Sequence, residues 1–193
     1  MVSMKRRERR AATPEEARAL ANPLRLRILR LSLDQALTNK QLAERLDMDP
    51  GTVLHHVRTL VRTGFLAAEA VRQGERGALE KPYRATGKSW TLSVGDALGR
   101  PTGGEASSAE AMLEAFRAEF EEAGPDSARD FTRLALTLNE ASLEELETRL
   151  GVVLDEFADR PHDPDGEPLG LLVAIHRLKP DQPPGSGGVA PTS

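Results

Sequence analysis

The chain has 193 residues, of which 26 are lysine or arginine, 30 are aspartate or glutamate and none is cysteine. Disulfide bonds, thiolate metal ligands and thiol-based redox sensing are therefore excluded, because no other side chain supplies a soft sulfur anion. No apolar stretch reaches the length of about 18 residues that a membrane-spanning helix needs, so no membrane segment is expected. These features favour a cytoplasmic protein.

The charges are divided unevenly along the chain. Residues 1–90 hold 18 basic and 10 acidic residues, which leaves 8 basic and 20 acidic residues for 91–193. The formal net charge of −4 thus combines a basic first half with an acidic second half. We expect a polyanionic partner to bind the first half and to be repelled by the second.

Residues 1–12 form a basic stretch with no apolar face. Its cations are Lys5, Arg6, Arg7, Arg9 and Arg10. We interpret this stretch either as a flexible arm that contacts phosphates or as a solvated tail. A signal peptide is not expected, because no apolar segment follows the basic run.

Two helices are predicted after this arm, over residues 14–21 and 22–33. Asn22 followed by Pro23 is typical of an N-cap and a first helical position. The spacing of Leu24, Ile28 and Leu31 places them on one face, which we expect to be buried. The second helix also has cations that we expect to reach solvent or phosphate: Arg25, Arg27 and Arg30.

The next segment, residues 38–66, predicts two short helices joined by a tight turn. Thr38 is a suitable N-cap for the first helix. Asp49 is expected to cap the second, which has Pro50 at its first position, where the missing N–H costs nothing. Gly64 is the expected residue just beyond its end.

The second of these helices separates apolar from polar residues. At about 100° per residue, its apolar side contains Val53, Leu54, Val57, Leu60 and Val61. Its outward side contains Gly51, Thr52, His55, Arg58, Thr59 and Arg62. No acid occurs between Pro50 and Gly64, so this side is cationic. Because all of its charges are positive, this side is expected to bind a polyanionic partner rather than only to face solvent.

A hairpin is predicted directly after this helix. Residues 65–73 and 78–86 have the length and composition of strands, with a glycine-rich turn at 74–77. Four cations lie along it: Arg72, Arg76, Lys81 and Arg84. A hairpin after a helix-turn-helix is typical of a winged helix, whose helix enters the major groove while the hairpin contacts the backbone or a minor groove. For Arg76, an exposed turn charge without a partner is the alternative.

Three consecutive stretches of the first half, taken together, resemble a known family. ALANPLRLRILRL, then TNKQLAERLDMDPGTVLHHVRTLVRTGFL, then a wing ending in KPYRAT are similar to the ArsR-type winged-helix transcriptional regulators, over about residues 11–90. The resemblance implies that residues 50–63 are the recognition helix. It further implies dimerisation through terminal helices.

The same resemblance implies roles for individual positions. Gly51, Thr52, His55 and Arg58 are the expected base-reading or groove-edge residues, with Thr59 and Arg62 beside them. Thr38, Lys40 and Gln41 are expected to contact the DNA backbone, and Arg72, Arg76, Lys81 and Arg84 are the expected wing contacts. Leu54 either touches a thymine methyl or packs, and His56 is interpreted as a half-buried packing or hydrogen-bonding residue.

The chain departs from this family in its lack of cysteine. Many members sense metals through cysteines, and no such site is available here. A site built on His162 and Asp163 is disfavoured, because RPHDPDGEP has the composition of a solvated turn. We expect no bound metal and no cofactor.

The second half begins with a predicted linker at residues 95–106, followed by a helix at 107–124. Ser107 and Glu110 have capping-box spacing. The helix has an apolar stripe of Met112, Leu113, Phe116 and Phe120. This stripe must pack either on its own domain or on a second copy, and the family resemblance favours dimerisation.

A β-α-β unit is predicted over residues 127–179. Residues 131–139 alternate in strand fashion, a helix is expected from 142 to 158, and residues 170–178 form a second strand. The tail at 180–193 is rich in proline, glycine and serine, and we expect it to be disordered. The unit is interpreted as a ligand sensor, a dimerisation module or a docking module.

The expected fold class is α+β: a winged helix-turn-helix domain at 13–94, then a helix and the small β-α-β unit. No catalytic constellation occurs, so an enzyme is not expected. We expect a regulator that binds specific sites in double-stranded DNA, acts as a homodimeric repressor and has an effector of unknown identity. The alternative is a protein-interaction module whose winged helix docks on a protein.

Overall fold

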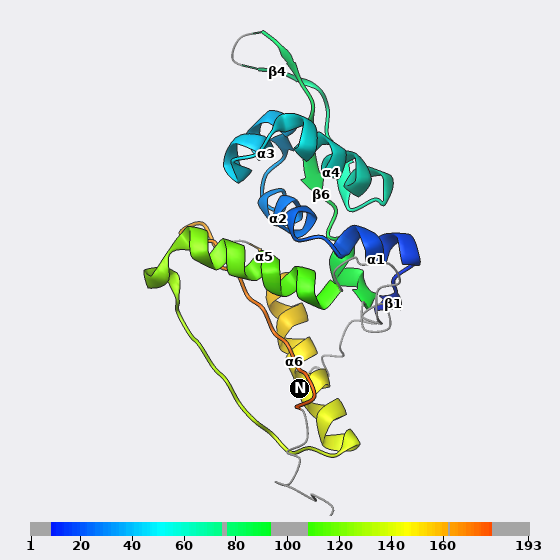
Figure 1. The fold of residues 1–193 in the computed structure, drawn as a ribbon, viewed down its shortest axis with the longest axis vertical. Helices are drawn as coiled ribbons and strands as arrows, with labels where there is room; N and C mark the ends of the chain where they lie inside the picture. Colours follow the sequence, from blue (N-terminus) through cyan, green and yellow to red (C-terminus); the bar gives the residue numbers. More distant parts are fainter. Residues whose placement is uncertain (1–8, 75–76, 94–107, 162, 179–193) are drawn as a thin grey trace, which may run out of the picture.

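The computed structural model describes residues 9–74, 77–93, 108–161 and 163–178 (Figure 1). The elements of the first half are β1 (Arg10–Ala11), α1 (Pro14–Leu20), α2 (Pro23–Leu31), β2 (Leu37–Thr38), α3 (Asn39–Leu46), α4 (Pro50–Arg62), β3 (Leu66–Ala68), β4 (Arg72–Gln73), β5 (Leu79–Glu80), β6 (Pro82–Ala85), η1 (Lys88–Thr91) and β7 (Leu92–Ser93). Those of the second half are α5 (Ser108–Ala123), η3 (Pro125–Ser127) and α6 (Glu140–Ala158).

The helices of the first half start at the residues that the sequence predicts. The side chains of Asn22, Thr38 and Asp49 each accept a hydrogen bond from a backbone N–H in the first turn of α2, α3 and α4. These bonds satisfy donors that would otherwise have no partner at a helix start. Gly64, just beyond the end of α4, has a φ of 74°, a conformation that costs glycine little.

A three-stranded antiparallel sheet in the order β2-β6-β3 completes the domain. The chain leaves this sheet through the hairpin of β4 and β5, in which Arg72 pairs with Glu80, and this hairpin is the wing. β1 runs parallel to β7 and so joins the start of the described chain to the segment after the wing. The predicted α+β winged-helix fold is confirmed.

The core lies where α2, α3 and α4 meet the sheet. Ile28, Leu42, Val53, Val57 and Leu60 are fully buried there. On α4, the predicted apolar side is buried along its centre but not at its edges. Leu54 is half-buried and Val61 is 38% exposed, because both lie at the border between the two faces of the helix.

The predicted helix at 107–124 is present as α5, which packs against α1 and α2 (Figure 1). Its buried hydrophobic residues are Ala111 and Ala115, whereas Leu113 of the predicted stripe is 54% exposed. Small side chains allow two helices to approach closely, which suits the alanines to this contact. The proposed cap Ser107 lies outside the described residues, as do the linker at 95–106 and the tail at 180–193.

All three arginines of α2 have partners within the protein. Arg30 is nevertheless exposed to solvent, as expected, whereas the side chain of Arg27 is mostly covered. Arg27 pairs with Glu122 and Arg30 pairs with Glu119, both carboxylates being on α5. Arg25 donates to two backbone carbonyls near the end of α1. The acidic face of α5 therefore neutralises this side of the winged helix.

The second half differs from its prediction in an informative way. α6 forms where a helix was expected but starts at Glu140, and the side chain of Asn139 caps it by accepting a hydrogen bond from the N–H of Ser142. Neither predicted strand forms: residues 131–139 and 170–178 are extended but pair with nothing in the described chain. Alternation of apolar residues indicates two faces, but a strand also needs a neighbour for its backbone N–H and C=O groups.

Arg9 connects α6 to the first half of the chain. Its guanidinium lies 3.4 Å from the Asp155 carboxylate of α6 and 5.9 Å from the centre of the Trp90 ring. None of the helices in the described ranges has the combination of length and hydropathy that crossing a bilayer requires.

Candidate nucleic-acid interface

The candidate interface consists of the outward side of α4, the start of α3 and the wing. Figure 1 shows α3 and α4 next to one another, with the wing projecting from the same end of the molecule. α5 and α6 lie toward the opposite end. The described residues of the acidic half therefore do not cover this end.

The first two turns of α4 present the polar side chains expected to read DNA. Gly51, Thr52, His55 and Arg58 are all exposed. Within the described part of the chain, Arg58 has no ion pair. Its guanidinium is thus available to an acceptor outside the protein.

The structure gives a steric reason for glycine at position 51. A Cβ atom on Gly51 would lie 2.9 Å from a carboxylate oxygen of Asp49. That carboxylate also accepts a 2.9 Å hydrogen bond from the backbone N–H of Thr52. A side chain at position 51 would push against the cap that starts the recognition helix.

The last turns of α4 are tied to the protein itself. The Thr59 hydroxyl donates to the carbonyl of His55 at 3.2 Å. The guanidinium of Arg62 lies 3.1 Å from the Glu15 carboxylate of α1, although both side chains are largely exposed. The structure therefore separates Thr59 and Arg62 from the four exposed residues at the start of the helix.

His56 lies at the border of the apolar face, as expected, and is half-buried. Burial lowers the pKa of its imidazole, and the nearby charges of Arg25 and His55 lower it further. Its Nδ1 atom is buried without a hydrogen-bond partner in the described residues. The arrangement favours the neutral imidazole, which suits a packing role.

The three residues at the start of α3 that were predicted to contact the DNA backbone differ in their burial and hydrogen bonding. Thr38 is buried, and its hydroxyl accepts from the N–H of Gln41, whose side chain accepts from the N–H of Thr38. This capping box leaves no Thr38 surface for a phosphate, so that contact is corrected to a structural role. Lys40 is exposed and lies 3.7 Å from Glu44, a weak surface pair that phosphate can replace.

The cations of the wing are arranged along both strands and their base. Arg72 lies 3.4 Å from Glu80, its partner across the hairpin, and Lys81 lies 6.0 Å from the centre of the Tyr83 ring. Arg84 pairs with Glu69 and donates to the carbonyl of Asp34 at 2.9 Å, so it fastens the base of the wing. Arg76 lies outside the described residues.

An open groove of about 900 Å³ separates the wing from the start of α3. Lys40, Gln41, Arg72, Lys81 and Tyr83 are among its lining residues. Cations from two elements that are separated in sequence thus line one groove. This arrangement suits a strand of phosphates.

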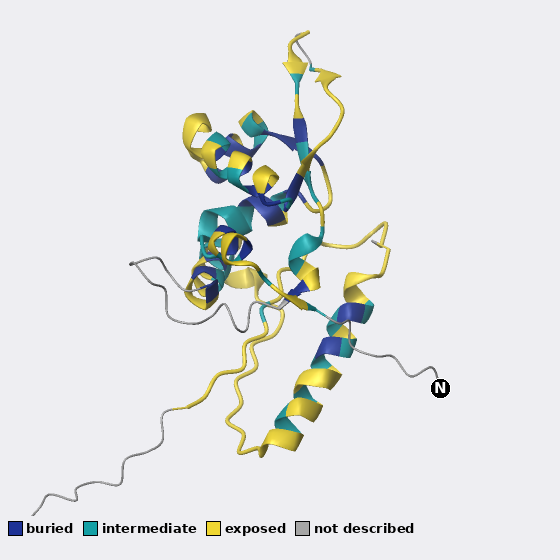
Figure 2. Ribbon diagram, turned by 90° about the vertical axis from the view of Figure 1, so that its right-hand side faces the viewer, coloured by how far each residue is buried: buried dark blue, intermediate teal, exposed yellow. Residues whose placement is uncertain are grey.

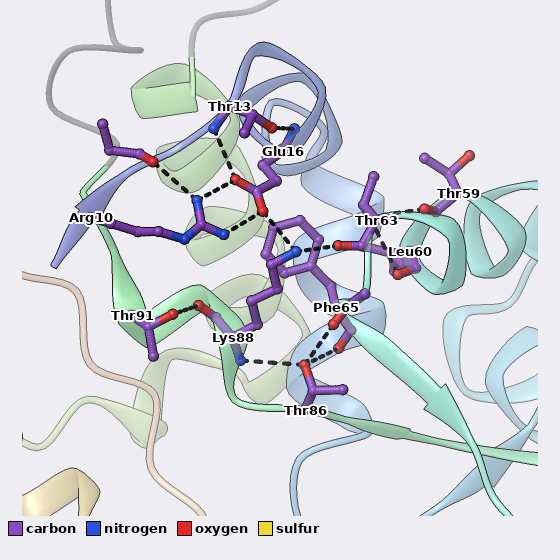
Figure 3. Close-up of polar contacts among 12 residues, drawn as sticks. Arg10, Thr13, Glu16, Thr59, Leu60, Thr63, Phe65, Thr86, Lys88 and Thr91 are labelled. Atoms are coloured by element: carbon purple, nitrogen blue, oxygen red, sulfur yellow. Dashed lines mark hydrogen bonds and ion pairs between the residues drawn. The ribbon is translucent and has the colours of Figure 1, made fainter.

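One buried ion-pair cluster next to this surface was not predicted from the sequence. Glu16 is buried, with its carboxylate 2.6 Å from Arg10 and 2.7 Å from Lys88 (Figure 3). The hydrogen bond from Arg10, followed by that from Lys88, holds the pKa of this carboxyl far below its ordinary value, against the opposing effect of burial. The Thr13–Glu16 capping-box spacing was visible in the sequence, but the contact with Lys88 was not.

The same cluster reaches the end of the recognition helix. The ammonium of Lys88 donates to the carbonyl of Thr63 at 2.6 Å and lies 5.1 Å from the centre of the Phe65 ring (Figure 3). A cation near the last carbonyls of a helix is favourable. Lys88 therefore helps to fix α4 relative to α1.

Among the described residues, no three His, Cys, Asp or Glu side chains are grouped so that they could hold a metal ion. His162, considered for such a site in the sequence, lies outside them.

Comparison with known proteins gives one family match and several similar folds. Residues 20–68 match the helix-turn-helix domain family. No curated protein sequence matches the chain. Similar solved structures include reduced HlyU from Vibrio cholerae, which is 22% identical over 53% of this chain and 81% of that one, with a TM-score of 0.31.

Two further structures are similar over a longer part of this chain. An apo variant of ZitR from Lactococcus lactis is 18% identical over 71% of this chain and 83% of that one, with a TM-score of 0.33. The adhesin competence repressor AdcR from Streptococcus pyogenes is 17% identical over 69% and 78%, with a TM-score of 0.31. These scores are too low to bear on function. The family match and the fold together make the first half a winged helix-turn-helix domain, of the kind by which transcriptional regulators bind DNA.

Proposed function

We propose that this protein is an ArsR-type transcriptional regulator of the cytoplasm that binds specific sites in double-stranded DNA as a homodimer and represses transcription. The observation that supports it most is the exposed start of α4. His55 and Arg58 project there beside a wing that contains cations. A buried apolar side holds the same helix in place.

In this proposal, α4 enters the major groove. Arg58 then donates two hydrogen bonds to a guanine edge, the commonest specific contact between protein and DNA. Thr52 and His55 contact neighbouring base edges, and Gly51 lets the backbone approach closely. Residues on the first two turns are the best placed, because recognition helices read bases with their amino-terminal residues.

Phosphate contacts come from the groove between the wing and α3. Lys40, Arg72 and Lys81 are the proposed contacts, with Arg76 at the wing turn. Arg72 exchanges the Glu80 carboxylate for a phosphate. These contacts set the position of the protein on the duplex but carry little sequence information.

Two copies of the winged helix match a site with two-fold symmetry, and their spacing sets the distance between half-sites. Met112, Leu113, Phe116 and Phe120 of α5 are proposed to contribute to the dimer. The exposure of Leu113 supports this role. Repression follows when the bound dimer occupies a promoter and blocks polymerase.

The test is selection of preferred duplexes from a random pool, followed by affinity measurements over a salt series. We expect a defined site and a fall in affinity of about a thousandfold or more between about 50 and 200 mM salt, because phosphate contacts release counterions. Arg160→Ala, which removes an exposed arginine just beyond the end of α6 and outside the interface, is the matched control. Binding to no duplex, or binding that salt barely changes, would instead indicate a protein-interaction module.

A further inference from the structure

The carboxy-terminal unit, residues 129–178, lacks an apolar core of its own. Its described residues include no buried hydrophobic side chain. Its helix α6 has a half-buried apolar stripe but packs only loosely on the other elements. A unit of this size does not become stable without burying apolar surface, so one copy of the chain leaves it incomplete.

The apolar side chains of this unit are concentrated on two extended segments, residues 131–138 and 169–178. Their large apolar residues include Leu134, Leu136, Leu171, Val173 and Ile175. These are between 46% and 74% exposed. Figure 2 shows both segments exposed along almost their whole length. Alternation along each segment places the apolar side chains on one face.

The backbone of these segments also lacks hydrogen-bond partners in the backbone of the described residues. Within the described residues, neither segment makes a backbone–backbone hydrogen bond. Their starts are held together by an ion pair of 2.7 Å between Arg129 and Glu167. Extended chain with free N–H and C=O groups and alternating apolar side chains is the geometry to which another strand adds.

We propose that a second copy of this chain covers the two extended segments, so that strands of the two copies pair and enclose a common core with both α6 helices. This inference deepens the proposed homodimer by locating its interface. It rests on the proposed function only where it concerns how the dimer binds DNA. In this arrangement α5 adds to the dimer but does not form it alone.

The exposed area is the first argument for a second copy as the occupant. A fully exposed aliphatic side chain offers roughly 100 Å² of surface to bury. The nine exposed large apolar side chains of the two segments are 41–74% exposed, so together they offer roughly 500 Å² per copy. A standard interface buries about 800 Å² per partner, of which about 65% is apolar in homodimers. The segments thus supply about the apolar area that a stable dimer needs.

Charge complementarity is the second argument. Arg133 and Arg177 on the segments are exposed, and no ion pair involves them within the described residues. The same holds for three carboxylates in the first half of α6: Glu140, Glu144 and Glu147. A two-fold pairing brings the cations of each copy to the carboxylates of the other.

Light scattering at several concentrations tests the interface on the full-length protein. We expect a dimer for the wild type and monomers for Leu136→Arg and Val173→Arg, with the dissociation constant raised at least a hundredfold. Thr137→Arg is the matched control. It adds the same charge to the opposite face of the same segment and is expected to stay dimeric. A monomeric wild type, or dimers that survive both arginine substitutions, would overturn the proposal.

Hydrogen exchange on the wild type gives a second measurement that needs no variant to fold. Within the described residues of one chain, the amides of both segments have no backbone acceptor, and the proposal attributes their protection to a second copy. We expect slow exchange at concentrations where the dimer prevails and fast exchange after dilution to monomer. Exchange at the rate of a free peptide in the dimer would overturn the interface. A dimer that binds no duplex would count against the proposed function alone.

Discussion

The ammonium of Lys88 lies 2.7 Å from the carboxylate of Glu16 and 2.6 Å from the carbonyl oxygen of Thr63. One side chain beyond the wing therefore joins α1 to the end of the recognition helix. Because Glu16 is buried, this junction is expected to contribute to stability far more than the exposed ion pairs around it.

Glu16→Gln should destabilise the fold by about 2–3 kcal/mol, because it removes a buried charge that accepts hydrogen bonds from two cations. Urea unfolding followed by circular dichroism measures the change. Glu15→Gln is the control at the neighbouring position. Its ion pair with Arg62 is largely exposed, so a loss below about 1 kcal/mol is expected. Equal losses for the two variants would show that the buried cluster has no special role.

The same carboxylate predicts how stability depends on acid. The pKa of Glu16 is lowered in the folded protein, so its contribution is complete above its ordinary value of 4.5 and is lost as the pH falls below that. Unfolding measured between about pH 6 and pH 3 should therefore show a steeper loss for the wild type than for Glu16→Gln. Parallel curves for the two proteins would contradict this assignment.

The lowered pKa of His56 predicts that the stability of the fold also depends on pH in a higher range. Its pKa is lowered by burial, so the folded protein favours the neutral ring and loses stability as the pH falls below the ordinary histidine value of 6.5. His56→Gln should flatten the difference in unfolding free energy between about pH 8 and pH 5.5. His55→Gln retains the buried ring and should keep most of that difference. The idea fails if His55→Gln flattens the curve instead.

Arg58 and Lys40 should differ in what they contribute to DNA binding. Arg58→Ala is expected to cost about 1–3 kcal/mol at the preferred site and much less on random duplex, because it removes a base contact. Lys40→Ala should weaken binding to the preferred site and to random duplex alike. It should also reduce the slope of log affinity against log salt concentration by about one, because one phosphate contact is lost. Fluorescence anisotropy on the two duplexes measures the ratio. Equal losses on both duplexes for Arg58→Ala would remove it from the base readers.

The winged helix could be predicted from sequence because its signals are local. Asn22, Thr38 and Asp49 cap their helices within three residues, and the apolar period of α4 is complete within its own length. The helix starts and the recognition surface follow from such short-range rules.

Contacts between distant segments could not be predicted in this way. Nothing near Lys88 in the sequence indicates that its ammonium reaches Glu16, because the fold of the whole domain sets that distance. Arg27 and Arg30 resembled free surface cations for the same reason, since their partners on α5 are far along the chain. At residues 131–139 the alternation was present, but alternation does not specify which strand lies alongside.

The neutralisation of α2 by α5 has a consequence for the kinetics of association. Arg27 and Arg30 are paired with carboxylates of α5. The α2 side of the winged helix therefore attracts a diffusing duplex only weakly. Arg58 and Lys81, at the end that contains α4 and the wing, have no ion pair within the described residues. Long-range attraction then turns the protein before contact, so that more collisions lead to a bound complex and fewer end with the wrong side against the phosphates.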